Sequence, residues 1–425
     1  MKKNFHIISS SIIFYLLYFL INLSYEKEIK YIKEEIYIDE DKNPYIKILN
    51  GGSISKFLIS LSSPILFTYK NDNNNINNIN DNNENPYIYT SIYNEAFSYL
   101  IKEGIFLLNH KFNYGYLINE SNSNLPHNYG LLGLGRGKLG VNKDFDNSNR
   151  FLQQLLNKNL ISKEIIYIGP YYKNNILLQK SNILIGKIDD SLDKKKYELP
   201  YCLLYNNSDN YYDCKISNFT IEDKNKNNIT SIYHEKKNNF IIAIFEERSI
   251  QPIYFPKSLY KNFKDYFNNK NCSCDEKKIV CDTSIKEKIN ISLVINNYKF
   301  ILNPEYVWNN GQLNFVFNRN DNIVILSSGF TGYYHRIYDN YNQKIYFSDE
   351  NGNIISLRNK KNNDIIYWAI YLSASGLILI ISIIIIIFGI KKWKRNLEEE
   401  VYSISFQKQR DEDNENEKDG TQTLL

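Results

Sequence analysis

Short runs of β-branched and aromatic residues follow one another along most of this chain. Examples are YIYTSIY, IIYIGPYY, NNFIIAIF and KINISLVINNYKFIL, and turn-forming residues such as Asn, Asp and Gly separate them. Runs of this length and composition are typical of β-strands. The sequence therefore predicts an all-β structure with few helices. With 425 residues, the chain is longer than one typical domain.

The charge balance argues against one class of partner. The chain has 51 Lys and Arg residues against 47 Asp and Glu residues, a formal net charge of +4, and the basic residues are scattered. Proteins that bind nucleic acid usually gather basic residues on one face. We therefore expect no nucleic-acid partner.

Two apolar runs lie near the ends of the chain. The first, from Ile7 to Leu23, follows two lysines and has the pattern of a secretory signal peptide. We place its end near residue 24, although no Ala-x-Ala pattern marks a cleavage site; an uncleaved signal anchor is the alternative. The second run, 365–390, contains no charged residue. As a helix it would be about 39 Å long, enough to span a bilayer.

The residues after the second run predict its orientation. Lys391, Lys392, Lys394 and Arg395 follow at once, and basic residues favour the cytoplasmic side. We expect a single-pass type I membrane protein of the secretory pathway, in an organelle membrane or at the cell surface, with its ectodomain lumenal or extracellular. The expected parts outside the main domain are a signal peptide (1–24), a short pre-domain segment (25–44), a transmembrane helix (365–390) and a disordered cytoplasmic tail (391–425).

All five cysteines lie in the second half of the ectodomain: Cys202, Cys214, Cys272, Cys274 and Cys281. In an oxidising compartment they should form disulfides. Cys202 and Cys214 flank a Tyr- and Asn-rich turn and could link a hairpin, while Cys281 could pair with Cys272 or Cys274, leaving one thiol unpaired. A zinc site would need a fourth ligand, and no His lies near. We therefore expect no metal and no cofactor.

Four stretches, in order along the chain, resemble segments of the pepsin-like aspartic proteases. They are KFLISLSSPILFTY (56–69), NYGLLGLGRGKLG (128–140) with FLQQLLNKNLI (151–161), IIAIFEERSIQPIYFPKSLYKNF (241–263) and VILSSGFTGYYHRIYDNYNQKIYFS (324–348). Two shorter stretches, SNILIGKIDDS (181–191) and ELPYC (198–202), are similar to the opening of the family's second lobe. The resemblance implies a bilobal, pepsin-like double β-barrel. We expect an N-lobe at 45–170, with an Asn-rich disordered loop at 71–85, and a C-lobe at 171–360.

The resemblance fails where the family carries its catalytic residues. Each lobe of a pepsin-like protease has Asp-Thr-Gly or Asp-Ser-Gly after an apolar strand, and the two Asp carboxylates share one proton. In this chain the triplets read Ser62-Ser63-Pro64 and Glu246-Glu247-Arg248. A serine hydroxyl holds no charge at working pH. The Glu side chain is one methylene longer than Asp, and both glycines are replaced. Tyr129 also replaces a usual Asp, and Phe97 is our candidate for the family's flap tyrosine.

These departures predict a protein that is not an enzyme. We expect a catalytically inactive pepsin-like protein that binds a peptide or protein in the cleft between its lobes, in an adhesion, scaffold or cargo role. The alternative is an aspartic endopeptidase with a degenerate site that uses Glu246. The anchoring resembles that of membrane-bound plasmepsins and of type I pepsin-like proteins of parasite gamete secretory organelles. The many Asn, Ile and Lys residues suggest an AT-rich genome such as those of apicomplexans.

Overall fold

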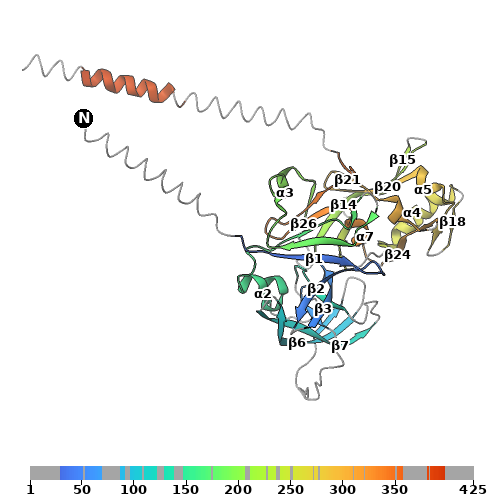
Figure 1. Cartoon of the computed structure of the whole chain (residues 1–425). Helices are drawn as coiled ribbons and strands as arrows, with labels where there is room; N and C mark the ends of the chain where they lie inside the picture. The colour runs from blue at the N-terminus through green and yellow to red at the C-terminus, as the bar shows by residue number, and fades with distance from the viewer. Residues whose placement is uncertain are drawn as a thin grey trace, which may run out of the picture. The chain divides into compact units, whose positions relative to one another are not determined.

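The structure is a computed structural model of the whole chain (Figure 1). It describes residues 29–50, 53–68, 87–90, 96–107, 110–121, 129–137, 147–173, 176–205, 211–225, 228–235, 240–248, 252–270, 272–275, 278–309, 311–319, 321–349, 352–357, 381 and 383–397. The chain divides into two compact units, residues 1–357 and residues 358–425. The first unit is mostly β-structure.

The largest element of the first unit is a 13-stranded sheet. Its strands, in spatial order, are β13 (Tyr201–Leu203), β27 (Lys344–Ser348), β26 (His335–Asp339), β9 (Ile165–Ile168), β12 (Lys180–Ile185), β1 (Ile32–Ile38), β2 (Pro44–Asn50), β3 (Ser53–Ser60), β8 (Tyr129–Gly133), β4 (Phe67–Thr68), β7 (His110–Ser121), β6 (Ala96–Leu107) and β5 (Tyr87–Thr90). Strands from both ends of the unit therefore share one sheet.

A nine-stranded sheet forms most of the second half of this unit. Its order is β24 (Phe315–Arg319), β17 (Ile253–Pro256), β25 (Ile323–Leu326), β16 (Ile241–Phe245), β14 (Asp213–Asp223), β20 (Ile289–Ile295), β21 (Tyr298–Ile301) and β28 (Ile354–Ser356), with β15 (Asn228–His234) also paired to β14. Two small sheets complete the β-structure: β10 (Tyr172–Lys173) with β11 (Ile176–Leu177), and β18 (Ser273–Cys274), β19 (Ile279–Val280), β23 (Gln312–Leu313) and β22 (Trp308–Asn309).

The described helices of the first unit are short. They are η1 (Asn147–Asn149), α2 (Phe151–Asn157), α3 (Asp190–Asp193), η2 (Lys196–Glu198), α4 (Lys257–Asn268), α5 (Ile285–Lys288), α6 (Pro304–Val307) and α7 (Ser328–Thr331). The longest of these, α4, buries Leu259, Phe263 and Phe267, which recur every four residues and so share one face. In Figure 1, α4 and α5 lie together in one part of the unit, and β2, β3, β6 and β7 lie in another.

The same strand arrangement occurs twice. In the first half, β3 runs parallel to β8, β8 pairs antiparallel with β4, and β4 runs parallel to β7. In the second half, β16 runs parallel to β25, β25 pairs antiparallel with β17, and β17 runs parallel to β24. Each arrangement places a loop after its first strand, 61–64 after β3 and 246–248 after β16. We call these the first and second centre loops, and the halves that carry them the N-lobe and the C-lobe.

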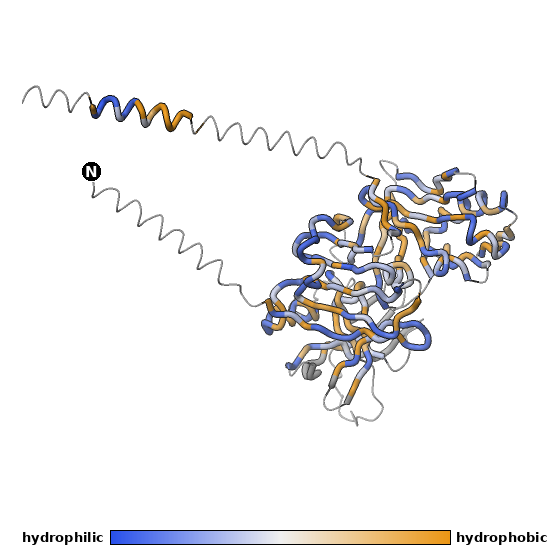
Figure 2. The backbone as a smooth tube through the Cα atoms, turned by 45° about the horizontal axis from the view of Figure 1, so that its top comes forward, coloured by the Kyte–Doolittle hydropathy of each residue, from blue (hydrophilic) through white to orange (hydrophobic). Residues whose placement is uncertain are grey.

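The folded unit begins earlier than the sequence suggested. We expected 25–44 to precede the domain, but β1 lies inside the 13-stranded sheet between β12 and β2. The strand was missed because three charged residues in succession interrupt the apolar residues of IKEEIYI. Only Ile36 is fully buried, and the exposure of the side chains alternates from residue 32 to residue 36. Such alternation is typical of a strand with one solvated face. Figure 2 shows hydrophobic and hydrophilic residues interleaved along the strands of this unit.

Several sequence expectations fall outside the described residues. These are the signal peptide (1–24), the Asn-rich loop (71–85), most of the membrane span (365–380) and most of the tail (398–425). In the second unit, residues 383–397 are helical, and this helix passes from hydrophobic to hydrophilic residues (Figure 2). Within the described ranges, no helix is both long and apolar enough to cross a bilayer.

Candidate functional site

The first centre loop closes on itself through short polar side chains. The Ser63 amide donates to Ser60 Oγ at 3.1 Å, and Ser63 Oγ donates to the Ile65 carbonyl at 3.1 Å. The Phe151 amide, at the start of α2, donates to the Pro64 carbonyl at 2.9 Å. Ser62 and Ser63 are both buried, with 5% and 0% of their surface exposed. The loop is therefore ordered without the glycine that the family usually places at its third position.

Two glycines of the run 130–135 lie directly beneath this loop. A Cβ atom at Gly133 would lie 2.0 Å from the Ile65 carbonyl oxygen, so no side chain fits there. The Gly135 amide donates to the Ser63 carbonyl at 2.7 Å. The Gly-rich motif noted in the sequence thus supports the first centre loop by close approach of two backbones.

The second centre loop carries charged side chains into a fully buried position. Glu246 and Glu247 are both 0% exposed, and Arg248 is 4% exposed. The Glu246 amide donates to the Leu326 carbonyl at 3.1 Å, which fixes the loop to the end of β25. Burial of carboxylates is costly unless they are paired or well hydrogen-bonded. Each of the two glutamates must therefore have a dense set of partners.

The Glu246 carboxylate joins the two centre loops. Ser62 Oγ donates to its Oε2, in a short hydrogen bond that brings the first residues of the two predicted triplets into contact. In all, six groups donate to this carboxylate: Ser60 Oγ, the Leu61 amide, the Ser62 amide, Ser62 Oγ, the Glu247 amide and the Arg248 amide. Three of those contacts come from Ser60 and Ser62 alone. The extra methylene of Glu is what lets one side chain reach across between the lobes.

Glu247 points the other way and forms a buried ion pair with Arg336 of β26. Arg336 Nε lies 3.0 Å from Oε1 and Nη2 lies 2.9 Å from Oε2, a two-bond geometry, and both side chains are 0% exposed. Thr331 Oγ1 and the Tyr338 hydroxyl also donate to Oε1, at 3.0 and 2.8 Å. Glu247 was named from the sequence as part of the altered triplet, but Arg336 was not.

Burial and the Glu247 charge also shift neighbouring pKa values. Burial, and then Glu247, raise the pKa values of the Tyr171 and Tyr338 hydroxyls well above the ordinary value. Burial is the largest single influence on the pKa of Arg336 and acts to lower it, but Glu247, Tyr171 and Tyr338 together outweigh it and the net shift is upward. Arg336 is therefore positively charged, and both tyrosines are neutral, at any working pH. The Arg336 guanidinium also lies over the Tyr171 ring, 4.6 Å from its centroid.

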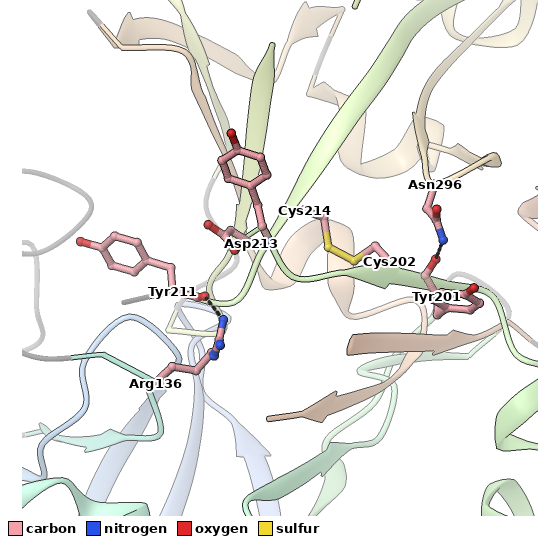
Figure 3. Close-up of a disulfide and its surroundings, with 8 residues drawn as sticks. Arg136, Tyr201, Cys202, Tyr211, Asp213, Cys214 and Asn296 are labelled. Carbon is pink, nitrogen blue, oxygen red and sulfur yellow. Dashed lines mark hydrogen bonds between the residues drawn. A yellow bond between two sulfur atoms is a disulfide. The ribbon is translucent and has the colours of Figure 1, made fainter. Parts of the chain in front are cut away.

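Arg136 links the lobes next to this centre. It follows β8 and donates from Nε to Asn340 Oδ1 at 2.6 Å, from Nη1 to the Tyr211 carbonyl at 3.3 Å, and from Nη2 to Gln343. Figure 3 shows the bond to Tyr211 beside the Cys202–Cys214 disulfide. Burial raises the pKa of Tyr211, with Arg319 opposing and Glu246 adding to the shift, so this hydroxyl lies within electrostatic reach of Glu246.

The cysteines follow one of the two predicted patterns. Cys202 and Cys214 form the predicted disulfide, which joins β13 to the start of β14 (Figure 3). Cys281 pairs with Cys272, and Cys274 has a free thiol. Cys274 Sγ lies 4.0 Å from the Cys272 carbonyl, and burial raises its pKa. Cys272 and Cys274 are separated by one residue, so sequence spacing could not choose between them.

Two further residues were named from the sequence, Tyr129 and Phe97. The Tyr129 hydroxyl donates to Asp39 Oδ2 at 3.0 Å, so it serves as a partner for the turn between β1 and β2. Phe97, the flap candidate, lies on β6, where it pairs with Tyr89 of β5 and Glu120 of β7. Its side chain lies outside the described residues.

The arrangement defines a class of protein: two β-lobes of equivalent topology, each with a loop after its first strand, and the two loops meeting at one buried point. Residues 101–350, more than half of the chain, match the model of the family described as eukaryotic aspartyl protease. The chain belongs to this family. A search of curated proteins found no match.

Family membership corrects one expectation. From the two altered triplets we expected a pseudoprotease, that is, no enzyme. That expectation is wrong on this comparison, because the matched family is one of proteases and membership indicates a peptidase. The altered triplets describe a centre with one shared carboxylate and neighbouring hydroxyls in place of two carboxylates.

Proposed function

We propose that this chain binds an extended polypeptide segment between its two lobes, at the Ser62–Glu246 centre. The observation that carries the proposal is the hydrogen bond between Ser62 and Glu246, which joins one residue of each lobe at a single buried point. In the aspartyl protease family the corresponding loops meet the peptide that the enzyme acts on. An extended segment would be held by main-chain hydrogen bonds, with side-chain pockets supplying selectivity.

Hydrolysis of that segment is the second candidate, and family membership favours it. Glu246 would accept a proton from a water molecule while the water oxygen forms a bond to the peptide carbonyl carbon. The C–N bond would then break as the proton passes from Glu246 to the leaving amine. Ser62 would take the place of the second carboxylate as a hydrogen-bond donor. For a water to reach Glu246 Oε2, the Ser62 hydroxyl must rotate away from it. Rotation of Ser62 is therefore a required step of this mechanism.

The cellular setting remains a proposal from the sequence. The chain would be a type I membrane protein of the secretory pathway, with the first unit lumenal or extracellular and residues after 390 cytoplasmic. The two disulfides support it, because disulfides persist in oxidising compartments. Its ligand would then be a secreted or membrane-bound protein, in an adhesion, scaffold or cargo role.

The test uses the full chain in detergent with a library of unstructured peptides. Bound peptides are identified after capture, and cleavage products are identified by mass spectrometry, at pH values from about 3 to 7. Retention of intact peptides supports binding. Cleavage that is lost in Glu246→Gln and kept in Glu235→Gln, a half-exposed surface carboxylate paired with Lys215, supports hydrolysis. If the chain neither retains nor cleaves any peptide, both proposals are wrong.

A further inference from the structure

The second centre loop has two adjacent carboxylates that point to opposite sides. Glu246 reaches the N-lobe at Leu61 and Ser62, while Glu247 reaches Arg336 in β26. The Glu247 amide donates to Glu246 Oε1 at 2.9 Å, so the two residues share one rigid segment of backbone. Fixing the position of the Glu247 side chain therefore also fixes the orientation of the Glu246 side chain.

Arg336 is held as firmly as Glu247. Besides its two bonds to Glu247, it donates from Nη1 to the Gly169 carbonyl at 3.0 Å and to the Tyr334 carbonyl at 2.6 Å. Both backbone acceptors belong to segments next to the 13-stranded sheet, after β9 and before β26. The guanidinium is planar and its donors have a fixed fork geometry, so such a set of acceptors admits one orientation.

A lone charge at either position would be unstable. Both side chains are fully buried, and an unpaired buried charge is strongly unfavourable. The two residues are 89 positions apart in the chain. Their pairing therefore locks the loop after β16 of the nine-stranded sheet to β26 of the 13-stranded sheet.

We propose that the Glu247–Arg336 ion pair positions the Glu246 centre. Glu247 and Arg336 are positioning residues: they hold the second centre loop so that the Glu246 carboxylate meets the Leu61 and Ser62 amides of the N-lobe. The consequence for a ligand rests on the proposed function, because the centre positioned here is the one that would meet the polypeptide. The positioning itself does not depend on any ligand.

Amide hydrogen exchange tests the positioning directly. In Arg336→Met, the exchange rates of the Leu61 and Ser62 amides should rise by about tenfold, as expected for members of one coupled network. If the ion pair stabilised only its immediate surroundings, exchange rates would change near residues 169 and 334, and those of the N-lobe amides would stay the same. Unchanged exchange at Leu61 and Ser62 would therefore overturn the proposal.

The matched control is another buried ion pair on the same strand. Lys196 pairs with Asp339 of β26, with side chains 8% and 0% exposed, and neither residue contacts the centre loops in the bonds described. Lys196→Met should leave exchange at Leu61 and Ser62 unchanged. A rise equal to that of Arg336→Met would show a general loosening of β26 and contradict the specific role.

A second variant keeps the test valid if Arg336→Met fails to fold. Glu247→Gln combined with Arg336→Met removes both charges and leaves no unpaired ion, so it should fold. The N-lobe amides should still exchange faster than in the wild type, because the fork that fixed the loop is gone; wild-type rates would overturn the proposal. Arg336→Lys, which keeps the charge without the fork, should give intermediate rates, and rates equal to those of Arg336→Met would contradict the requirement for charge.

Peptide capture on the same variants separates this inference from the proposed function. If the wild type retains peptides, Arg336→Met should retain about tenfold less at equal peptide concentration, and Lys196→Met should match the wild type. Equal retention by Arg336→Met would overturn the link to the ligand. If the wild type retains none, the proposed function is wrong, while the exchange data still decide the positioning.

Discussion

The two centre loops occupy equivalent places in the two lobes but are stabilised in different ways. In the first loop, the amide and hydroxyl of Ser63 make bonds to residues within three positions, Ser60 and Ile65. In the second, Glu247 contacts side chains 84 to 91 positions away. The first loop is closed by local hydroxyls. The second is held by the guanidinium and a tyrosine hydroxyl of β26 and by a threonine hydroxyl of α7.

This difference shows two ways for a tight loop to lose its usual glycine. Short polar side chains can satisfy the backbone groups of the loop itself, as serines commonly do in turns. Long charged side chains can instead anchor the loop to elements outside it, provided that each buried charge finds a partner. Glu246 connects the two loops, because it belongs to the second centre loop and accepts hydrogen bonds from the first.

Removing that joining group should have the largest effect. Glu246→Ala leaves six buried donors without their acceptor. We expect the free energy of unfolding to fall by about 3–5 kcal/mol, measured by chemical denaturation. Glu235→Ala, which removes a half-exposed partner of Lys215, should cost less than about 1 kcal/mol. Equal decreases in the free energy of unfolding for the two variants would contradict the conclusion that the Glu246 carboxylate joins the loops.

The next effect concerns covalent support, which only the second half of the first unit has. Replacing Cys202 and Cys214 by Ala opens a loop with a sequence separation of 12. We expect the free energy of unfolding to fall by about 3 kcal/mol in non-reducing denaturation. Cys274→Ala removes a free thiol and should change little. A larger loss in Cys274→Ala than in the double variant would contradict the disulfide assignment.

Removing a local hydrogen bond of the first centre loop should lower the free energy of unfolding by a smaller amount. Ser63→Ala removes a buried hydroxyl that donates to the Ile65 carbonyl, while the bond from the Ser63 amide to Ser60 remains. We expect the free energy of unfolding, measured with urea, to fall by about 1 kcal/mol. Ser231→Ala, an exposed serine bonded to Asn218, should cost close to nothing. If Ser63→Ala cost as much as Glu246→Ala, the two loops would not differ as described.

The smallest effect is one of pH, and it lies away from both loops. Asp189 caps α3, and hydrogen bonds from the Ser191 hydroxyl and amide, at 2.5 and 3.0 Å, lower its pKa although burial opposes them. Because the folded pKa lies below the unfolded one, Asp189 stabilises the fold above about pH 4 and this contribution is lost as the pH falls through the folded value.

Asp189→Ala should therefore lower stability near pH 6 by about 0.5 kcal/mol, a value reduced for solvent screening because the group is mostly exposed. The difference from the wild type should vanish at pH values below the folded pKa. Urea unfolding at pH 6 and near pH 2.5 measures both. Asp190→Ala, whose carboxylate is highly exposed, should differ little from the wild type at either pH. If the stability difference between Asp189→Ala and the wild type grew as the pH fell, it would contradict this prediction.

Much of this molecule could be predicted from local patterns. Strand-forming runs and the family resemblance indicated the β-rich, bilobal class, and the spacing of Cys202 and Cys214 indicated their disulfide. β1 was missed because its charged residues hid an alternating pattern. The choice of Cys272 over Cys274 depends on which side chain β18 turns toward Cys281, and two cysteines so close in sequence give no signal for that.

The partner of Glu247 could not be found by spacing, because topology brings β26 beside the second centre loop. One signal was nevertheless present. Arg336 lies in a strand whose other residues include Ile337 and Tyr338, all buried in the structure. A charged side chain inside a strand expected to be buried requires an opposite charge somewhere in the fold, and Asp339 of the same strand is already paired with Lys196. Glu247, a carboxylate where the family has a neutral residue, was the candidate.

The order of strands in the 13-stranded sheet has a consequence for how the protein is made. β1 begins at residue 32, while β26 and β27 come from 335–348, and all three belong to the same sheet. A chain emerging from the ribosome exposes the edge of β9 until nearly the whole unit has been synthesised, since β26 is its partner on that side. Pairings so distant in sequence form slowly, and open strand edges attract other chains in the meantime. Truncation before residue 335 would therefore leave β9 without its partner on that side, and a sheet that cannot be completed.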